Sequence, residues 1–341
     1  MVNITQIRRT VEPDVLKIPG VTGVGQTNRK LRIYVESLNP VEVPEQVGGI
    51  PVEVFETGPI MAMNLLNQYP YHVGPKFTSD RPAPYLVPQK ASQTSRLAKW
   101  RPVPGGVSLG HPKITAGTHG TSLRFLGYEL GLSNNHVLAA GSTIQHPQAV
   151  IGDPIYQPGP YDGGLPQDAV GSLYDYIPID EEGVNLVDAA LWQPDEGVMA
   201  DEILEIGEPK GVTQPALNEV VKKSGRTTAY SEGEILDVDA TVKGINFGTF
   251  FATFNHQIIT GHMSAGGDSG SLLLNRSDKA VGLLFAGSDL VTVHNPILTV
   301  LDAFKGIWPS PPPQPPAGGG QLGQEFLKDI GIMLAGLLLA S

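Results

Sequence analysis

The chain has 341 residues, of which 17% are charged, and it contains 41 glycines and 30 prolines. This composition favours a mainly β protein with many short strands and turns over a helix bundle, and the length allows roughly two to three domains. A formal net charge of -11 argues against partners such as nucleic acid or an anionic membrane, which require a basic surface. The absence of cysteine excludes disulfides, a thiolate nucleophile and Cys-ligated zinc.

Residues 1–60 are predicted to form a small α/β domain. Ile7, Val11, Val15 and Leu16 are spaced as on one face of a helix, and the runs LRIYVES and IPVEVFETG alternate apolar and polar residues as half-buried strands do. The first twenty residues lack the apolar run of a secretory signal, so a cytoplasmic location is expected.

The rest of the chain divides by composition. Residues 61–105 are rich in proline, serine and basic residues, which predicts a linker or a draped loop. Residues 106–308 hold short apolar runs broken by glycine and proline, which predict a β-sandwich or a pair of barrels. Residues 309–322 are a proline- and glycine-rich spacer.

Residues 323–341 are predicted to form an apolar C-terminal helix. The apolar run from Ile330 to Ala340 is shorter than the roughly 20 residues that span a bilayer. Small residues four apart, such as Gly331 and Ala335, permit close pairing of helices. We expect this tail to pack on another copy or on the body of the protein, and the alternative is contact with a membrane surface.

The stretch GGDSGS carries the strongest chemical signal. Ser269 stands among glycines, which permit tight turns and close approach of a second molecule, and a buried-strand pattern, Leu272 to Leu274, follows at once. A serine hydroxyl on such a turn attacks a carbonyl when a base and an acid support it. His136 follows the strand-like run GYELGLS, and Asp188 opens the apolar run DAALW.

The order His136, Asp188, Ser269 is that of the two-barrel chymotrypsin type. SNNHVLA, VDAALW and GGDSGS resemble the three boxes of trypsin-like serine proteases. Together with IGDPIYQPGPYDGG, GRTT and AVGLLFAGS they resemble more particularly the bacterial branch related to plant narrow-leaf serine proteases. The resemblance implies a chymotrypsin-like double β-barrel over 106–308 and a tendency to form homo-oligomers.

The resemblance also implies the roles of the site residues. Ser269 would be the nucleophile, His136 the general base and acid, and Asp188 the residue that orients the imidazole. The amides of Gly267 and Ser269 would form the oxyanion hole. Met263, six residues before the nucleophile, would lie at the floor of the primary specificity pocket. Phe285, Ala286 and Gly287 would form the wall that pairs with the substrate backbone.

Asp268 needs a positive partner, because an unpaired buried carboxylate is costly. Bacterial relatives use an internal basic residue in place of a new N-terminus. Lys223 in KKSGRTT occupies the matching place, and Arg226 is the second candidate. The sequence therefore predicts an enzyme that needs no N-terminal trimming.

Other polar residues have simpler interpretations. Asp175 and Asp180 are alternatives to Asp188 for the catalytic acid, but the sequence around each is more typical of an acidic residue in a loop. The cluster from Asp180 to Glu182 is more typical of a solvated loop than of a metal site. The glycine-rich stretches GGVSLG and AGGD neither open a helix nor carry the lysine of a phosphate-binding loop, so no nucleotide site is predicted.

The sequence thus predicts a serine endopeptidase that forms an acyl-enzyme, without metal or organic cofactor. Its substrate would be a protein or peptide with an apolar P1 side chain, since the expected pocket floor is uncharged. One alternative is a protease-fold scaffold or regulatory binding protein with low or switched activity. Another is an enzyme that cuts its own chain between Pro70 and Gly106, where the composition favours nicking.

Overall fold

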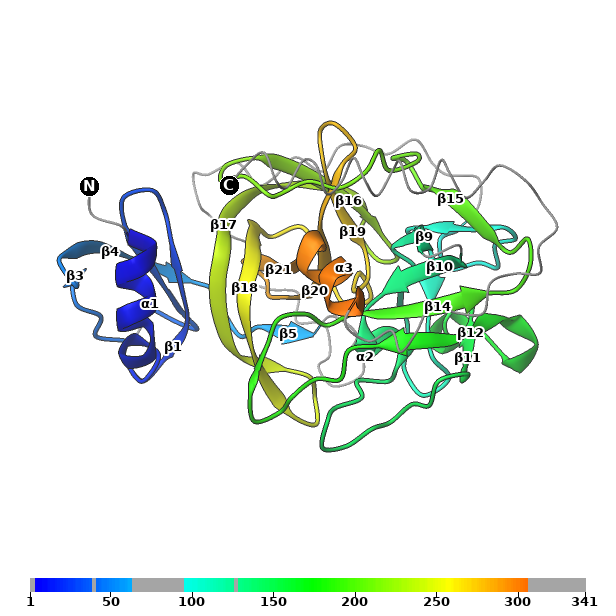
Figure 1. Ribbon diagram of the computed structural model, residues 1–341, viewed down its shortest axis with the longest axis horizontal. Coiled ribbons are helices and arrows are strands. Elements are labelled where there is room, and N and C mark those ends of the chain that lie inside the picture. The colour runs from blue at the N-terminus through cyan, green and yellow to red at the C-terminus, as the bar shows by residue number, and fades with distance from the viewer. Residues whose placement is uncertain (1–3, 39–40, 63–94, 126–127, 306–341) are drawn as a thin grey trace. The chain divides into compact units, whose positions relative to one another are not determined.

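The computed structural model describes residues 4–38, 41–62, 95–125 and 128–305, and those up to Phe304 belong to one compact unit. The spacer over 309–322, the C-terminal helix over 323–341, and residues 63–94 of the predicted linker lie outside the described residues. The mainly β fold predicted from the sequence is confirmed (Figure 1).

The N-terminal α/β unit is a helix packed on a small sheet. It consists of α1 (Ile4–Val15), β1 (Val21–Gln26), β2 (Leu31–Val35), β3 (Gln46–Val47) and β4 (Ile50–Glu56). The helix buries Val15 against Val21, Val24 and Ile33 of the sheet, as the periodicity of its apolar residues requires. Strand β1 also pairs antiparallel with β17 (Ala229–Asn246), at Gly23↔Val242 and Val24↔Thr241. The sheet of this unit therefore continues into the sheet that carries the serine.

A five-stranded antiparallel sheet supplies the histidine and the aspartate. Its strands, in spatial order, are β11 (Pro154–Tyr156), β12 (Ala169–Tyr176), β14 (Ala190–Pro194), β10 (Tyr128–Ser133) and β9 (Thr121–Phe125). Trp192 and Leu132 are fully buried. A Cβ on Gly131 would stand 2.0 Å from the Trp192 indole nitrogen, so glycine is needed there for the ring to pack.

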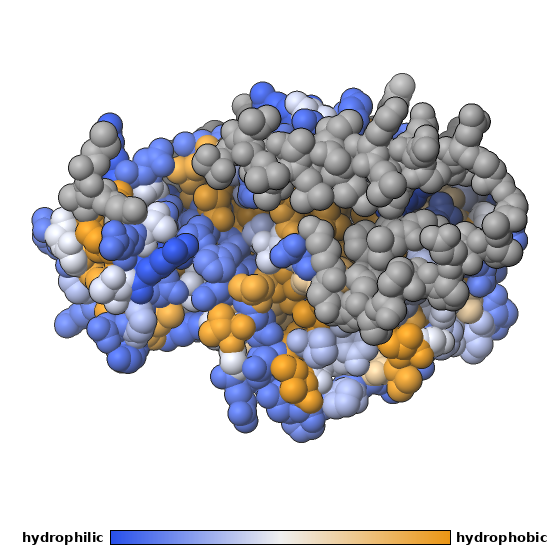
Figure 2. Space-filling model, viewed as in Figure 1, coloured by the Kyte–Doolittle hydropathy of each residue, from blue (hydrophilic) through white to orange (hydrophobic). Residues whose placement is uncertain are grey.

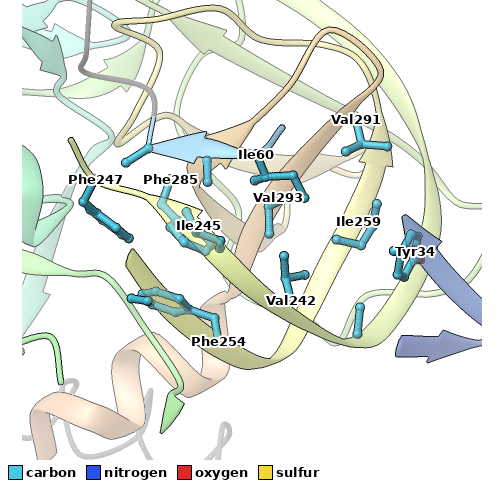
Figure 3. Close-up of a cluster of buried hydrophobic side chains, with 14 of the residues drawn as sticks. Tyr34, Ile60, Val242, Ile245, Phe247, Phe254, Ile259, Phe285, Val291 and Val293 are labelled. Atoms are coloured by element: carbon cyan, nitrogen blue, oxygen red, sulfur yellow. The ribbon is translucent and has the colours of Figure 1, made fainter. Parts of the chain in front are cut away.

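A larger sheet supplies the serine. Beside β17 it contains β13 (Val184–Asn185), β18 (Phe251–Gly261), β21 (Val291–Pro296), β20 (Ala280–Gly287), β19 (Leu272–Asn275) and β16 (Val220–Gly225). Its interior is a cluster that contains Phe254, Ile259, Phe285 and Val293, shown in Figure 3. The long strands β17 and β18 are curved (Figure 1), and several register shifts along their pairing allow that curvature.

Short elements complete the described chain. They are β5 (Met61–Ala62), β6 (Val103–Gly105), β7 (Ser108–Leu109), β8 (Gly117–Thr118), β15 (Met199–Ile203), α2 (Asn135–Leu138), α3 (Ile297–Lys305) and the 3-10 turns Pro160–Asp162 and Pro166–Asp168. The segment predicted as a linker, residues 61–105, thus has a strand at each of its two ends. Among the described residues, no helix is long and apolar enough to cross a membrane.

The described surface is mixed in polarity. Figure 2 shows apolar groups standing among hydrophilic ones on the face it presents. The most exposed large apolar side chains of the described residues are Val150, Phe251 and Ile144, at 70%, 63% and 62% exposure. Scattered exposed apolar residues are ordinary on protein surfaces, and the homo-oligomer inferred from the sequence stays a prediction.

The N-terminal unit is joined to the large sheet by a buried carboxylate. Asp237 of β17 accepts hydrogen bonds from the Tyr34 hydroxyl at 3.0 Å and from the Gln26 amide at 2.9 Å. A Cβ on Gly25 would lie 1.9 Å from this carboxylate, so glycine allows its approach. Burial raises the pKa of Asp237, and the hydrogen bonds from Tyr34 and Gln26 act in the opposite direction. These two donors therefore offset part of the cost of burying the carboxylate.

Replacement of Tyr34 by phenylalanine removes one of these donors and leaves a buried acceptor less satisfied. We expect Tyr34→Phe to lower the free energy of unfolding by about 1–3 kcal/mol, measured by urea denaturation. Tyr161→Phe is the control, because Tyr161 is 55% exposed and should change stability by less than about 0.5 kcal/mol. Equal small effects of the two substitutions would contradict this role of Tyr34.

Candidate active site

The histidine and the aspartate are brought together by the register of two neighbouring strands. Strand β10 pairs with β14 at Ser133↔Ala190. His136 lies three residues beyond Ser133, in the short helix α2, and Asp188 lies two residues before Ala190. Because the strands are antiparallel, these two segments leave the sheet at the same end. The pairing therefore places the two side chains next to each other.

The two side chains form a buried pair. Asp188 Oδ2 is hydrogen-bonded to His136 Nδ1, and Asp188 Oδ1 accepts from the His136 backbone amide at 3.2 Å. Asp188 is fully buried and His136 is 1% exposed. The carboxylate thus contacts the histidine at two points and directs Nε2 away from itself. This is the orientation that a general base needs.

Two asparagines hold the backbone of Asp188. Asn134 Nδ2 donates to the Asp188 carbonyl at 2.7 Å, and the Asp188 amide donates to Asn295 Oδ1 at 2.9 Å. Asn134 belongs to the motif that the sequence analysis singled out, whereas Asn295 comes from the end of β21 and carries no local signal. Only the pairing of distant strands reveals Asn295 as a supporting residue.

Ser269 stands on the turn between β18 and β19, and this turn docks on β8 and on the end of β10, the strand that leads to the histidine. The Thr118 amide donates to the Ser269 carbonyl at 2.7 Å, and Thr118 Oγ1 donates to the Gly267 carbonyl at 2.8 Å. A Cβ on Gly270 would lie 2.1 Å from Ser133 Oγ. Ser133 lies three residues before His136, so this contact brings the serine turn beside the histidine segment.

Glycine is required on the serine turn for conformation as well as for space. Gly267 has a φ of +97° and Gly270 a φ of +93°, a region that side-chain-bearing residues rarely adopt. Ser269 is buried, and its hydroxyl donates to the Phe285 carbonyl at 3.2 Å. The turn is therefore fixed by its own backbone, by Thr118 and by β20.

Lys223 is the partner of Asp268. Its ammonium lies 3.1 Å from Asp268 Oδ2, and both side chains are fully buried. Burial by itself raises the pKa of Asp268, but the charge of Lys223, the hydroxyl of Thr228 and the amides of Ala265 and Thr227 outweigh it, so the pKa lies below its usual value. Burial lowers the pKa of Lys223, and Asp268 opposes that shift.

Arg226, the second candidate partner, binds elsewhere. Its guanidinium pairs with Asp162, with Nε 2.9 Å from Oδ2 and Nη2 2.5 Å from Oδ1, and it lies over the Tyr161 ring. Arg226 thus supports the loop of Asp162, which also accepts from the Ser108 hydroxyl. Lys223 and Arg226 were both candidates to pair with Asp268. Lys223 pairs with Asp268, and Arg226 pairs with Asp162.

Thr227 holds the peptide that precedes Gly267. Its hydroxyl donates to the Gly266 carbonyl at 2.6 Å. In a trans peptide the carbonyl and the following N–H point in opposite directions, so the Gly267 N–H is directed away from Thr227. This is the orientation that leaves the amide available as an oxyanion donor, and Thr227 had no assigned role in the sequence analysis.

The predicted specificity residues are apolar and buried. Phe285 packs its ring on Phe254, with ring centroids 4.7 Å apart, and Ala286 belongs to the same cluster. Met263 is 3% exposed and packs with Val221 and other residues of a second cluster. The place of Met263 at the floor of a specificity pocket stays a prediction.

The remaining titratable candidates lie apart from this arrangement. Burial lowers the pKa values of His119 and His294 to about 3, so both imidazoles are neutral packing groups. The Asp175 carboxylate accepts from the Tyr176 amide, and that of Asp180 accepts from Gln145. The described residues contain no group of three or more His, Asp or Glu side chains that could hold a metal ion.

Comparison with known proteins finds likeness in structure alone. No protein-family model matches the chain, and no curated protein matches it. Thermobifida fusca protease A is similar with 20% identity and a TM-score of 0.44, over 59% of this chain and 95% of its own. Nocardiopsis protease is similar with 15% identity and a TM-score of 0.42, over 59% of this chain and 96% of its own. Cellulomonas bogoriensis chymotrypsin is similar with 18% identity and a TM-score of 0.41, over 60% of this chain and 96% of its own.

These neighbours are bacterial serine proteases of the chymotrypsin fold. At 20% identity or less the likeness concerns the fold alone. The resemblance and the fold class that the sequence predicted agree with them.

Loss of the Lys223 ammonium should leave Asp268 charged and unpaired in the interior. We expect Lys223→Met to cost about 3–5 kcal/mol of folding free energy at neutral pH. Lys210→Met is the control, because the Lys210 side chain is 68% exposed where it pairs with Asp278, and exposed pairs are worth about 0–1 kcal/mol. Similar losses in both variants, measured by denaturant unfolding, would contradict the argument.

The cost of Lys223→Met should also depend on pH. In the wild type the lowered pKa of Asp268 means that its stabilising contribution is present above the unfolded pKa of about 3.9 and is lost as pH falls. In the variant burial raises that pKa, so the penalty should shrink toward acid pH as the carboxyl group takes up a proton. A difference between wild type and variant that stays constant from pH 7 to 4 would count against this pairing.

Removal of the Thr227 hydroxyl should release the Gly266 carbonyl and misdirect the Gly267 amide. We expect Thr227→Val to slow reaction of Ser269 with a small fluorophosphonate roughly a hundredfold, the scale of one lost oxyanion donor, while stability changes little. Thr227→Ser retains the hydroxyl and should restore the rate. A Thr227→Val protein that reacts as fast as the wild type would show that the hydroxyl does not position the amide.

Proposed function

We propose that this chain is a serine endopeptidase that hydrolyses peptide bonds through an acyl-enzyme. The observation that carries the proposal is the buried His136–Asp188 pair at the end of one sheet, beside a docked turn that presents Ser269 from the other. A serine on a glycine turn, an oriented imidazole and a buried carboxylate are the groups that this chemistry requires.

The proposed reaction begins when Ser269 Oγ turns from the Phe285 carbonyl toward His136. Oγ attacks the carbonyl carbon of the scissile bond while His136 Nε2 takes the hydroxyl proton, and Asp188 stabilises the resulting imidazolium. The amides of Gly267 and Ser269 receive the developing oxyanion. His136 then returns the proton to the leaving amine, and a water molecule repeats the sequence on the acyl-enzyme to release the acid.

The internal ion pair supports an enzyme that acts without N-terminal processing. Lys223 already provides the positive charge that Asp268 needs, so no newly formed N-terminus is required to neutralise it. The apolar and uncharged surroundings of Met263 and Phe285 support a preference for apolar P1 side chains over lysine and arginine. Protein or peptide substrates follow from the same chemistry.

The proposal is tested by treating the full chain with diisopropyl fluorophosphate and measuring the intact mass. This small reagent reports an activated serine without requiring a known substrate. We expect one diisopropylphosphorylated site in the wild type, none in Ser269→Ala, and unchanged labelling in Ser277→Ala, a serine on the β19–β20 turn. A folded wild type that does not react would overturn the enzyme proposal in favour of a protease-fold scaffold.

A further inference from the structure

The edge of strand β20 runs from the nucleophile turn to the short strand β5. The Leu284 amide donates to the Ser271 carbonyl, and the Gly270 amide donates to the Leu284 carbonyl. The carbonyl of the next residue, Phe285, accepts a hydrogen bond from the Ser269 hydroxyl. Beyond it, Ala286 pairs with Ala62 and Gly287 pairs with Met61. Strand β5 therefore occupies the same edge of β20. Its pairing begins one residue past Phe285, the residue that contacts the reacting serine.

This edge is the one that an extended peptide would need. Strand β19 pairs with β20 only between Ala280 and Leu283, and β21 covers the opposite edge as far as Gly287. A peptide that adds as a strand beside Ser269 gains main-chain hydrogen bonds from a free edge. Residues 286 and 287, part of the wall predicted to pair with substrate, are instead paired with the chain itself.

Strand β5 runs along β20 toward the residue that contacts Ser269. The pairing is antiparallel, with Met61 opposite Gly287 and Ala62 opposite Ala286. The chain therefore advances along β20 toward Phe285, whose carbonyl receives the Ser269 hydroxyl. A peptide whose scissile bond reached Ser269 along this edge would have to displace these two residues.

Strand β5 is held in place from both sides. Ile60 and Ala62 are 6% and 1% exposed, in the cluster that contains Phe285 and Phe247 (Figure 3). On the far side the Asn246 amide of β17 donates to the Ile60 carbonyl at 3.1 Å.

The segment that leads into β5 is anchored on two elements. The Ser288 hydroxyl donates to the Thr57 carbonyl, and the Thr57 amide donates to the Val35 carbonyl of β2 at 2.8 Å. A segment tethered in this way stays at the edge at an effective concentration on the order of millimolar.

We propose that β5 is an autoinhibitory strap: its pairing with Ala286 and Gly287 closes the backbone-recognition edge of the site, and peptide hydrolysis requires its displacement. This inference rests on the proposed function. The strap blocks peptides that bind along β20, whereas a small reagent that needs only Ser269 and the oxyanion amides does not compete with it. The two kinds of reagent therefore separate the state of the nucleophile from the state of the edge.

The first experiment locks the strap with a disulfide. Met61 pairs in parallel with Asn246 of β17, at a strand spacing of about 4.8 Å that suits a disulfide, and the chain has no other cysteine. In Met61→Cys/Asn246→Cys, we expect cleavage of dye-labelled casein at least about tenfold slower in the oxidised protein than in the same protein reduced, because a closed disulfide removes the open state. Met61→Cys alone controls for the oxidant.

The second experiment loosens the strap. Ile60→Ala removes a buried side chain from the residue that directly precedes β5, and Ile259→Ala removes the same kind of side chain from β18 in the same cluster. We expect Ile60→Ala to cleave casein roughly tenfold faster than the wild type, because it shifts the strap toward the open state, and Ile259→Ala to leave the rate unchanged. If Ile60→Ala does not fold, the comparison of oxidised and reduced Met61→Cys/Asn246→Cys still tests, within one folded protein, whether β5 controls casein cleavage.

Labelling by diisopropyl fluorophosphate is measured beside casein cleavage in every variant. Equal labelling with cleavage that follows the state of the strap is the expected result. Equal labelling with equal cleavage in the oxidised and reduced lock would overturn the strap while the proposed function stands. Absence of labelling in all folded forms would overturn the proposed function, and the strap inference with it.

Discussion

The ion pair between Lys223 and Asp268 is the interaction on which the serine turn depends. Asp268 is adjacent to Ser269, and its buried carboxylate organises the turn by accepting from the amides of Thr227, Thr228 and Ala265. A carboxylate that collects these amides must be ionised to bind them well, and an ionised group in the interior requires a counter-charge. Lys223 supplies that charge from the neighbouring strand β16.

The second constraint is the docking of the serine turn on β8 and on the end of β10. Thr118 belongs to β8, and it binds the carbonyls of Gly267 and Ser269 through its side chain and its amide. The missing side chain at Gly270 lets the turn approach the backbone of Thr118 and the hydroxyl of Ser133. The nucleophile is therefore held against the histidine segment by backbone contacts, which depend little on side-chain rotamers.

The same β20 strand serves the core, the nucleophile and the strap. Phe285 contributes its ring to the interior and its carbonyl to the Ser269 hydroxyl, while the following two residues pair with β5. This coupling gives the N-terminal unit a physical route to the site, because Thr57, four residues before β5, donates its amide to the Val35 carbonyl of β2. Regulation through that route needs only movement of a short segment, with both sheets unchanged.

The sequence by itself determined the features that are encoded locally. Alternating and glycine-broken apolar runs predicted a mainly β chain, and the periodicity of Ile7, Val11 and Val15 predicted the helix that begins at Ile4 and ends at Val15. Three short motifs predicted His136, Asp188 and Ser269, because each motif places its own residue at the end of a strand or on a turn. The structure brings the histidine and aspartate into contact and docks the serine turn beside them.

Tertiary structure alone decided the features that depend on strand register. Asn295 supports Asp188 from a strand more than a hundred residues away in sequence, and nothing in its neighbours marks that role. The choice of Lys223 for Asp268 and of Arg226 for Asp162 follows from where each residue stands, because Lys223 lies within β16 and Arg226 lies just beyond its end. The pairing of β5 with β20 lies in a stretch whose composition predicts a loop, because two residues are too few to show a period. Only the folded sheet supplies the strands that β5 joins, β17 on one side and β20 on the other.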